Sequence, residues 1–362
     1  MKAVSKHLFT FFGLLALAIL TLSFARPGTE FMIYQFPREM TPSIDGDFSE
    51  WELVPDSFMI GSDQLRNAVK KEGEPQDPAD YDLKVKVGWV KGLNRLYFYV
   101  EAYDDYWDFS DRGLEQDVFE VVVDADLSGG NFIDIANAHS DRLTRQELSF
   151  KGHGAHAQNY HIFTPAKDKD WAMIWGNAYW IKDYPHAQAV SVHDLEPGDA
   201  GTLKMEFYIT PFDHASRDGF DHSVVSNLRE NELIGLSWLS YEYDGRGKKE
   251  TFRTLSHDIR MIRDADYLCA FRLMPLEEQF RKAIDADWAF AEVDREERII
   301  QFMDRSEGKV ESWYWDFGDG TSSTRQHPQH HYQTEGNWTV ILTVDGPEGS
   351  SSISKVWDVV TK

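Results

Sequence analysis

The 362-residue sequence predicts an all-β protein with two tandem β-sandwich domains, joined by a short helical linker. Two observations support this fold class. Apolar residues come in short segments in which every second residue is apolar, which is the period of a β-strand. These segments are rich in aromatic residues, which make up 14% of the chain, and clusters of Gly, Asn, Asp and Ser separate them. A chain of this length can bury two separate cores.

Five segments have the strongest strand character, because they combine β-branched and aromatic residues and end at turn signals. These segments are residues 83–90, 96–100, 118–123, 203–209 and 233–238. Turns are expected at 92–94 and 128–131, and polar loops over 62–80 and 134–160. Many short strands with polar connections are typical of a β-sandwich.

One stretch has the spacing of a helix. Leu276, Phe280 and Ile284 follow Pro275 at intervals of four residues. Proline at the first helical position and acidic residues in the first turn are typical of helix starts. The expected organisation is a first domain over 30–272, a helical linker over 273–287 and a second domain over 288–362.

The first 25 residues have the composition of an export signal. Lys2 and Lys6 precede an apolar stretch over 8–22, and Ser23-Phe24-Ala25 has the small residues of a cleavage site. We expect a signal peptide over 1–25 that is cleaved after Ala25, so that the protein is secreted and lies in an extracellular or periplasmic location. The alternative is an uncleaved anchor, although the apolar stretch is short for a spanning helix. No other segment predicts membrane insertion.

The formal net charge of -24 restricts the partners of the protein. An acidic surface repels nucleic acids and anionic membranes, so neither is an expected partner. Carboxylates are hard oxygen ligands that suit calcium, although a solvated acidic surface explains the composition equally well. The single cysteine, Cys269, lies in an apolar segment, so we expect a buried, unreactive thiol and no intrachain disulfide.

A specific motif lies near the C-terminus. Residues 313–320 read WYWDFGDG and end a strand-like alternation in a Gly/Asp turn, and HHY follows at 330–332. This block resembles the polycystic kidney disease (PKD) domain over about residues 288–362. The resemblance implies an immunoglobulin-like β-sandwich that serves as a spacer or adhesion module, with a cell surface or another protein as its partner. We expect Asp316 and Asp319 to shape the turn through hydrogen bonds to the backbone.

Four segments follow one another in a characteristic order in the N-terminal part. They are residues 44–51 (IDGDFSEW), 96–105 (LYFYVEAYDD), 116–124 (QDVFEVVVD) and 203–212 (LKMEFYITPF). In this order they resemble the family 9 carbohydrate-binding module and its DOMON-like relatives over about residues 40–260, with a departure at Thr210, which separates the last strand from Pro211. The resemblance implies a lectin-like sandwich that binds an oligosaccharide or polysaccharide between tryptophans without catalysis. It also implies calcium as a loop-stabilising cofactor.

Several aromatic residues are candidates for stacking on sugar rings. These are Tyr106, Trp107, Trp171, Trp175 and Trp180. Sugar rings have apolar C–H faces that stack on aromatic planes, while polar side chains bind the hydroxyls. Core packing is the alternative for each of them. It is the stronger expectation for tryptophans in strand patterns, which are Trp51, Trp89, Trp238 and Trp315.

Four aspartates are candidate calcium ligands: Asp45, Asp47, Asp124 and Asp126. Residues 124–131 begin like an EF-hand loop, but Ile135 stands where the twelfth-position Glu would be, so they do not form one. An acidic turn at the end of a strand is the alternative.

No catalytic residue is assigned, and three other functions stay open. A polysaccharide-active hydrolase needs two carboxylates across a cleft, whereas Glu120 and Asp124 lie about 13 Å apart along one strand, so the pair would come from different strands. DOMON-like relatives include haem-binding redox proteins with axial Met and His, for which Met173 and Met205 are the candidate methionines. The third alternative is a surface adhesion or structural protein without a small ligand.

Overall fold

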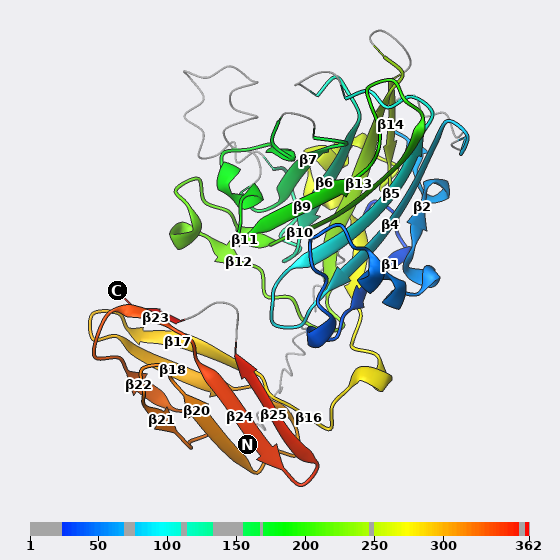
Figure 1. The fold of residues 1–362 in the computed structure, drawn as a ribbon. Coiled ribbons are helices and arrows are strands. Elements are labelled where there is room, and N and C mark those ends of the chain that lie inside the picture. Colours follow the sequence, from blue (N-terminus) through cyan, green and yellow to red (C-terminus); the bar gives the residue numbers. More distant parts are fainter. Residues whose placement is uncertain are drawn as a thin grey trace, which may run out of the picture.

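The computed structural model describes residues 24–68, 77–109, 114–132, 155–166, 169–245, 250–354 and 359–361. Within these residues the protein consists of β-strands and of 3-10 turns that are at most five residues long. None of these turns is long and apolar enough to cross a membrane. The strands form two domains in tandem (Figure 1), so the predicted fold class is confirmed. Of the predicted signal peptide, only Phe24 and Ala25 lie within the described residues.

The first domain contains most of the strands. They are β1 Glu30–Gln35, β2 Ile60–Gly61, β3 Arg66–Asn67, β4 Tyr81–Trp89, β5 Leu96–Asp104, β6 Val118–Asp124, β7 Gln158–Phe163, β8 Ala172–Ile174, β9 Ala187–Val192, β10 Gly201–Ile209, β11 Phe212–His214, β12 Val224–Val225, β13 Leu233–Tyr243, β14 Glu250–Thr254 and β15 Cys269–Leu273. Its 3-10 turns are η1 Arg38–Met40, η2 Ser49–Leu53, η3 Asp56–Phe58, η4 Ser62–Gln64, η6 Tyr179–Lys182, η7 Phe220–His222, η8 Ile259–Ile262 and η9 Ala265–Tyr267. All five segments with the strongest predicted strand character are strands.

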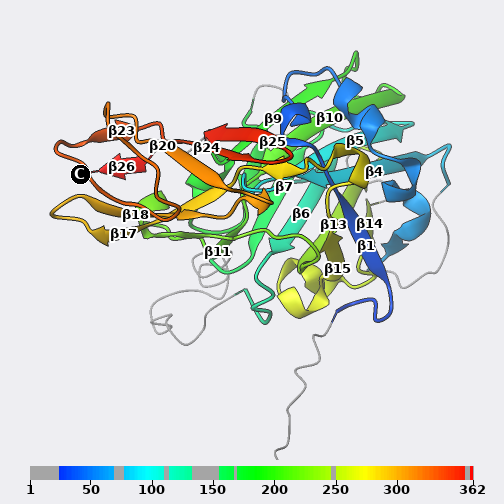
Figure 2. The same cartoon turned by 90° about the horizontal axis from the view of Figure 1, so that it is seen from below.

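These strands form two layers. The first layer has the order β8-β7-β6-β13-β15, with β14 beside β13, and the second has the order β4-β5-β10-β9, with β2 beside β4. Strand β1 belongs to both, because residues 30–33 pair in parallel with β15 and residues 34–35 pair in parallel with β4. Figures 1 and 2 show these two layers from the side and from below.

The main core lies between the two layers. Each strand turns every second side chain inward, and in β6 these are Phe119, Val121 and Val123. From the second layer, Phe98 and Phe207 stack with their ring centroids 4.6 Å apart and face them. The alternation read from the sequence is therefore the alternation that fills the core.

The predicted core tryptophans are all buried. Trp89 and Trp238 lie between the layers, Trp51 lies in a cluster on the outer face of the second layer, and Trp315 lies in the core of the C-terminal domain. Cys269 is also buried, and burial raises the pKa of its thiol to about 12. The thiol is therefore protonated and unreactive at neutral pH, as predicted.

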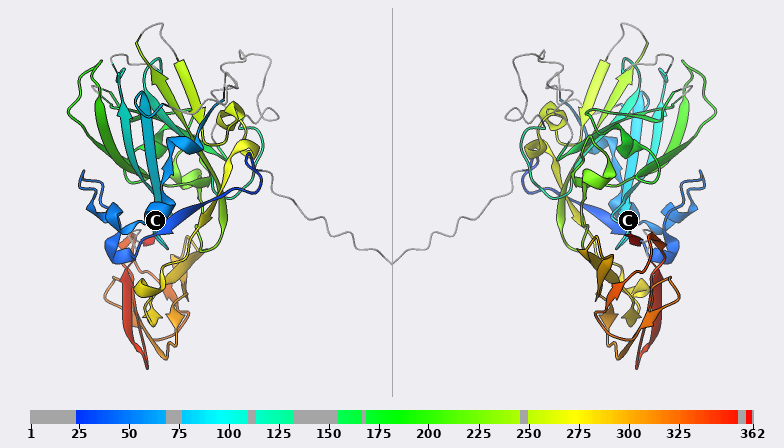
Figure 3. Two further views of the ribbon diagram at one scale, coloured as in Figure 1. Left: turned by 90° about the vertical axis from the view of Figure 1, so that its right-hand side faces the viewer. Right: turned by 90° about the vertical axis from the view of Figure 1, so that its left-hand side faces the viewer.

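The C-terminal domain is a smaller sandwich. Its strands are β16 Ile284–Asp285, β17 Trp288–Asp294, β18 Ile299–Asp304, β19 Glu307–Gly308, β20 Ser312–Asp316, β21 Ser322–Ser323, β22 Gln329–His331, β23 Gly336–Trp338, β24 Ile341–Gly346, β25 Gly349–Ser354 and β26 Val359–Thr361. The sheets β17-β18-β22 and β21-β20-β24-β25 enclose a core that includes Trp288, Phe302, Trp315 and Tyr332. Figure 3 shows this domain below the first one from two sides.

The linker differs from the prediction of a helix over 273–287. The chain forms one 3-10 turn there, η10 Glu278–Phe280, and Arg281 is already extended. Ile284 is buried in the core of the C-terminal domain and pairs with Gly308, so it does not continue a helical face with Phe280. Tertiary pairing has overridden the helical spacing, and the C-terminal domain begins at Ile284 instead of at residue 288.

Hydrogen bonds from the backbone to its two aspartates stabilise the Gly/Asp turn after β20. Asp316 Oδ1 accepts a hydrogen bond from the backbone N–H of Gly318 at 2.9 Å, and Asp319 Oδ1 accepts one from the N–H of Thr321 at 3.0 Å. The predicted role of both aspartates in shaping the turn is confirmed.

We expect Gly318→Ala to destabilise the C-terminal domain more than Gly320→Ala. Both glycines have left-handed backbone, with φ of +80° and +85°, which costs an L-residue roughly 1 kcal/mol. A Cβ at Gly318 would also lie 2.7 Å from the carbonyl oxygen of Thr339, whereas a Cβ at Gly320 would have nothing within 4 Å. Urea unfolding should show a loss of about 2–3 kcal/mol for Gly318→Ala and about 1 kcal/mol for Gly320→Ala. Equal losses would contradict the close approach.

We also expect the C-terminal domain to lose stability in acid through Asp319. Burial raises the pKa of this carboxyl, but hydrogen bonds from Thr321 and from His330, whose Nε2 lies 2.7 Å from Asp319 Oδ2, outweigh burial and leave the pKa lowered. The ionised carboxylate therefore stabilises the fold above its unfolded pKa of about 3.9, and this stabilisation disappears as the pH falls through the folded pKa. Thermal unfolding should show Asp319→Asn less stable than wild type at pH 6, with the difference vanishing towards about pH 2. A difference that is independent of pH would refute this.

Candidate functional site

The structure places the first two predicted ligand residues, Tyr106 and Trp107, in different surroundings. Trp107 is 1% exposed, and its indole N–H donates to the carbonyl of Gly201 at 2.9 Å. Its assignment to a sugar-binding surface is therefore wrong, because the chain bends inward after β5 and pairs with the loop at Asp199. Tyr106, by contrast, is 39% exposed and lies beside Gly198.

The three remaining predicted aromatics do not share one surface. Trp171 packs against the core, where its ring stacks on Tyr160 at 6.5 Å. Trp175 lies on the outer face of the first layer, with its ring 5.7 Å from that of His161. Trp180 lies in η6 and donates to a carbonyl near η7. All three are half-buried, so the ligand site predicted from the sequence is not assembled as a whole.

Three exposed aromatic side chains lie close to Trp180 in the chain or against its ring. Tyr179 is 48% exposed, Tyr184 is 79% exposed and Phe220 is 43% exposed. The ring of Phe220 lies 6.3 Å from that of Trp180 and stacks on His186 at 4.9 Å. We refer to Tyr179, Trp180, Tyr184 and Phe220 as the aromatic surface. Exposed aromatic side chains grouped in this way are typical of a binding surface.

The four aspartates predicted to bind calcium accept hydrogen bonds from backbone N–H groups and so stabilise turns. Asp45 Oδ1 accepts from the backbone N–H of Asp47 at 2.9 Å, and Asp47 Oδ1 accepts from the N–H of Ser49 at 3.1 Å. Asp124 and Asp126 cap the turn after β6 by accepting backbone N–H groups of residues 128 and 129. The structure brings these two pairs into no common group of three ligands among the described residues.

Three other aspartates do come together at one end of the first domain. Asp80 precedes β4, Asp105 follows β5 and Asp244 follows β13, and one carboxylate oxygen from each lies within 4.8 Å of the others. We refer to these residues as the carboxylate cluster. In the part of the chain that the structure describes, it is the only such group of three acidic, histidine or cysteine side chains.

Buried acids lie close to the carboxylate cluster. Burial, together with the charges of Glu242, Asp105 and Asp244, raises the pKa of Asp104 to about 7, although the hydrogen bond from the Tyr106 N–H opposes this shift. Burial raises the pKa of Asp117 well above its usual value, and the neighbouring charge of Asp104 adds to this. This end of the sandwich therefore concentrates negative charge in a poorly solvated place.

Another buried carboxylate, Glu120, is fully paired on the outer face of the first layer. It accepts from Asn159 Nδ2 at 2.7 Å and from the Tyr241 hydroxyl at 2.6 Å, and His161 Nε2 lies 3.5 Å away. Burial lowers the pKa of His161, and the charge of Glu120 opposes this shift. The arrangement stabilises the sheet and leaves no exposed acid for glycoside hydrolysis at this position.

The candidate haem methionines are not placed as axial ligands. Met205 faces the core, and Met173 lies directly across the strand pair from His161. Side chains opposite each other on adjacent strands are about 5 Å apart at Cβ, which leaves no room for a porphyrin between them. The geometry gives no support to the haem-binding alternative.

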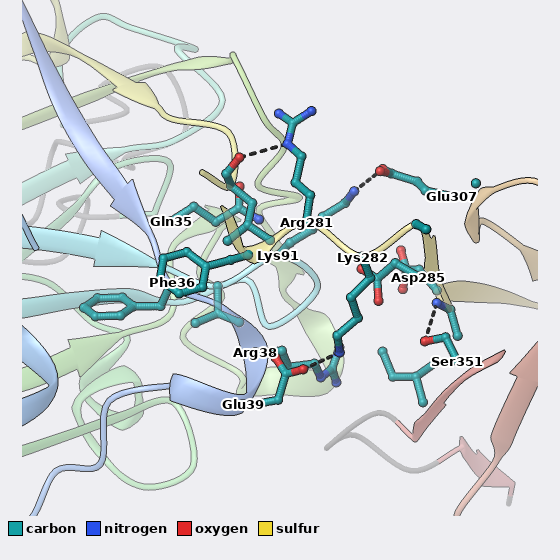
Figure 4. A pocket seen from close by; sticks show the side chains of 18 of the residues that line it. Gln35, Phe36, Arg38, Glu39, Lys91, Arg281, Lys282, Asp285, Glu307 and Ser351 are labelled. Atoms are coloured by element: carbon teal, nitrogen blue, oxygen red, sulfur yellow. Dashed lines mark hydrogen bonds and ion pairs between the residues drawn. The ribbon is translucent and has the colours of Figure 1, made fainter. Parts of the chain in front are cut away.

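A cavity of about 560 Å³ lies between the two domains. Ion pairs join Lys91 to Glu307 and Lys282 to Glu39 (Figure 4). Arg38 also donates to the carbonyl of Ser354 at 3.2 Å. Charged groups that already pair with one another dominate its walls, so it is not an aromatic groove for a sugar. These contacts instead connect the C-terminal domain to the first domain and the linker.

The sequence held signals for the residues that the prediction missed. Tyr184 lies between Asp183 and Pro185, and Phe220 lies in a polar stretch, both of which are typical of exposed turns. The three aspartates of the carboxylate cluster each stand at the end of a strand-like segment. Ends of antiparallel strands meet at one end of a sandwich, but the strand order needed to pair them is not visible in the sequence.

Comparison with known proteins gives matches for both domains. The first domain is similar to a family 9 carbohydrate-binding module from Caldicellulosiruptor kristjanssonii in complex with cellotriose, with a TM-score of 0.44 and 14% identity over 69% of this chain and 96% of that one. The PKD1 domain of the Vibrio cholerae metalloprotease PrtV is 28% identical with a TM-score of 0.19, over 22% of this chain and 98% of that one.

Curated relatives match over short stretches. Collagenase ColA of Bacillus cereus is 32% identical over 143 residues, which are 38% of this chain and 14% of that protein. The chain thus spans only a small part of the length of this relative. The family model of the PKD domain matches residues 284–361, which is the C-terminal sandwich from the start of β16 to the end of β26. The C-terminal domain is therefore a PKD domain, as the WDFGDG turn predicts.

Proposed function

We propose that the first domain binds a saccharide, without making or breaking bonds in it, at the aromatic surface of Tyr179, Trp180, Tyr184 and Phe220. The observation that carries this proposal is the exposure of three large aromatic side chains, of which Phe220 contacts the ring of Trp180 and Tyr179 and Tyr184 are its near neighbours in the chain. Exposing such side chains to water is unfavourable, and a sugar ring that stacks on them removes their faces from water.

The surroundings of the aromatic surface supply the polar groups that a sugar also needs. Asp183 lies between Trp180 and Tyr184 in the chain, and its side chain is 61% exposed. Its neighbour Lys182 is held by Asp183 and Asp170, so both charges are fixed in position. Carboxylate and ammonium groups beside aromatic planes can bind hydroxyls while the rings take the apolar faces.

The fixed position of Trp180 favours a binding role for the aromatic surface. Trp180 is anchored by its indole N–H, which donates to the Ser216 carbonyl at 2.8 Å, and by edge contacts with Phe212. Rings that are already fixed lose little conformational freedom when a ligand binds. In this proposal the protein is exported by the signal peptide, and the PKD domain is a spacer or adhesion module that presents the first domain.

We expect Tyr184→Ala and Phe220→Ala each to weaken saccharide binding by about tenfold, which corresponds to ~1.4 kcal/mol. A glycan array on the purified protein would identify the saccharide, and calorimetry would measure the affinities of the variants. Tyr314→Ala is the matched control, because Tyr314 is 49% exposed but lies in the PKD domain. Trp107→Phe should keep full affinity, because Trp107 is a core residue.

Several outcomes would contradict this proposal. If no saccharide binds, or if Tyr184→Ala and Phe220→Ala bind as wild type does, the aromatic surface is not the site. If reducing ends accumulate when the protein is incubated with a polysaccharide, the non-catalytic assignment is wrong. If only a protein partner is lost in these variants, the aromatic surface is an adhesion interface.

A further inference from the structure

Polar contacts join the two domains, and no apolar core is shared between them. Each hydrophobic cluster of the described residues lies wholly within one domain, and the cluster of the C-terminal domain begins at Ile284. A cavity of about 560 Å³ lies between the domains instead. Domains that share little apolar surface are free to move relative to each other. It is therefore the charged groups around the cavity that hold the domains in the observed orientation.

Two cationic side chains of the first domain reach the C-terminal domain. Lys91, which follows β4, forms an ion pair with Glu307 in β19 (Figure 4). Arg38 in η1 donates to the carbonyl of Ser354, the last residue of β25, at 3.2 Å. All four residues line the cavity, so these two contacts bridge it.

Acidic side chains of the C-terminal domain lie near Arg38. Burial lowers the pKa of Arg38, and the charges of Asp287 and Asp285 oppose this shift. A Cβ at Gly92 would lie 3.5 Å from Arg38 Nη1 and 3.9 Å from Asp287 Oδ1, so the guanidinium and the carboxylate meet at the same turn of the first domain. Arg38 is therefore held by charge as well as by its hydrogen bond.

The linker between β15 and β16 is attached to the first domain at both ends. The indole N–H of Trp89 donates to the carbonyl of Met274 at 3.0 Å, and Lys282 pairs with Glu39. Residues 275–281, all within the described part of the chain, have a single 3-10 turn, η10, as their regular structure. Such a short irregular segment can absorb the backbone rotations of a domain movement.

The ion pairs at the cavity are accessible to dissolved salt. The side chains of Lys91 and Glu307 are 32% and 64% exposed. Those of Lys282 and Glu39 are 50% and 58% exposed. Ion pairs with this exposure are individually weak. Salt screens them, because the Debye length falls from about 10 Å at 0.1 M salt to about 3 Å at 1 M, so molar salt removes most of the attraction between the domains.

We propose that the linker is a hinge that ionic strength controls. At low ionic strength, the contacts of Lys91 and Arg38 hold the C-terminal domain against the first domain. At high ionic strength these contacts are screened, and the C-terminal domain pivots about residues 278–283. The hinge thereby changes the distance between the aromatic surface and the PKD domain, and it acts whether or not a saccharide binds.

The test is small-angle X-ray scattering of the purified protein in about 0.1 M and about 1 M NaCl. We expect the radius of gyration to be larger by roughly a tenth in the higher salt. Lys91→Glu should show the larger radius already in the lower salt, because it places a second negative charge beside Glu307. Exchanging the charges, in the double variant Lys91→Glu with Glu307→Lys, should restore the smaller radius. Lys84→Gln is the matched control, because Lys84 pairs with Glu101 inside the first domain at 3.1 Å.

Three results would overturn the proposal. They are an equal radius in both salt concentrations, a double variant that keeps the larger radius of Lys91→Glu, and a larger radius in Lys84→Gln. The comparison of salt concentrations uses the unaltered protein, so it decides the proposal even if a variant is unstable. Near-ultraviolet circular dichroism that does not change with salt would show that both cores stay folded while the radius changes. None of these results bears on saccharide binding.

Discussion

The first domain depends on the packing of two sheet layers that strand β1 holds together. Its first four residues extend the first layer beside β15, and its last two extend the second layer beside β4. The single cysteine is unpaired, so no disulfide reinforces this connection. The stability of the domain therefore rests on the apolar core between the layers and on the hydrogen bonds of β1 along both of them.

Two layers closed in this way also decide where polar side chains can gather. The faces between the layers are filled by apolar residues, so acids lie on the outer faces of the strands, as Glu120 does, or at the strand ends, where chain reversals reach solvent. Asp80, Asp105 and Asp244 belong to three different strand ends that the sandwich brings together. Asp104 is the inward-facing residue at the end of β5. The strand alternation would place an apolar residue at this position, but here it buries a carboxylate.

The sequence predicted what is local and missed what depends on pairing. The period of two identified β4, β5, β6, β10 and β13, and the WDFGDG motif identified the turn, because each is set by neighbouring residues. The prediction of a helical linker was wrong for the opposite reason, because Ile284 pairs with Gly308, which is distant from it in the chain. The assignment of Trp107 to the ligand site was wrong for the same reason, because its indole N–H donates to the carbonyl of Gly201, which is distant in the chain. Polar neighbours in the sequence made Trp107 look exposed, but exposure is decided by the fold.

The aromatic surface and the carboxylate cluster lie at opposite ends of β10. Its first residue, Gly201, pairs with Asp104 beside the cluster, while its last, Ile209, pairs with Ala187, which closely follows Tyr184. Nine residues of strand span roughly 25–30 Å. The acids at one end therefore cannot contact a saccharide bound at the other. The acidic end and the aromatic end are two separate chemical features, and each is supported by different observations.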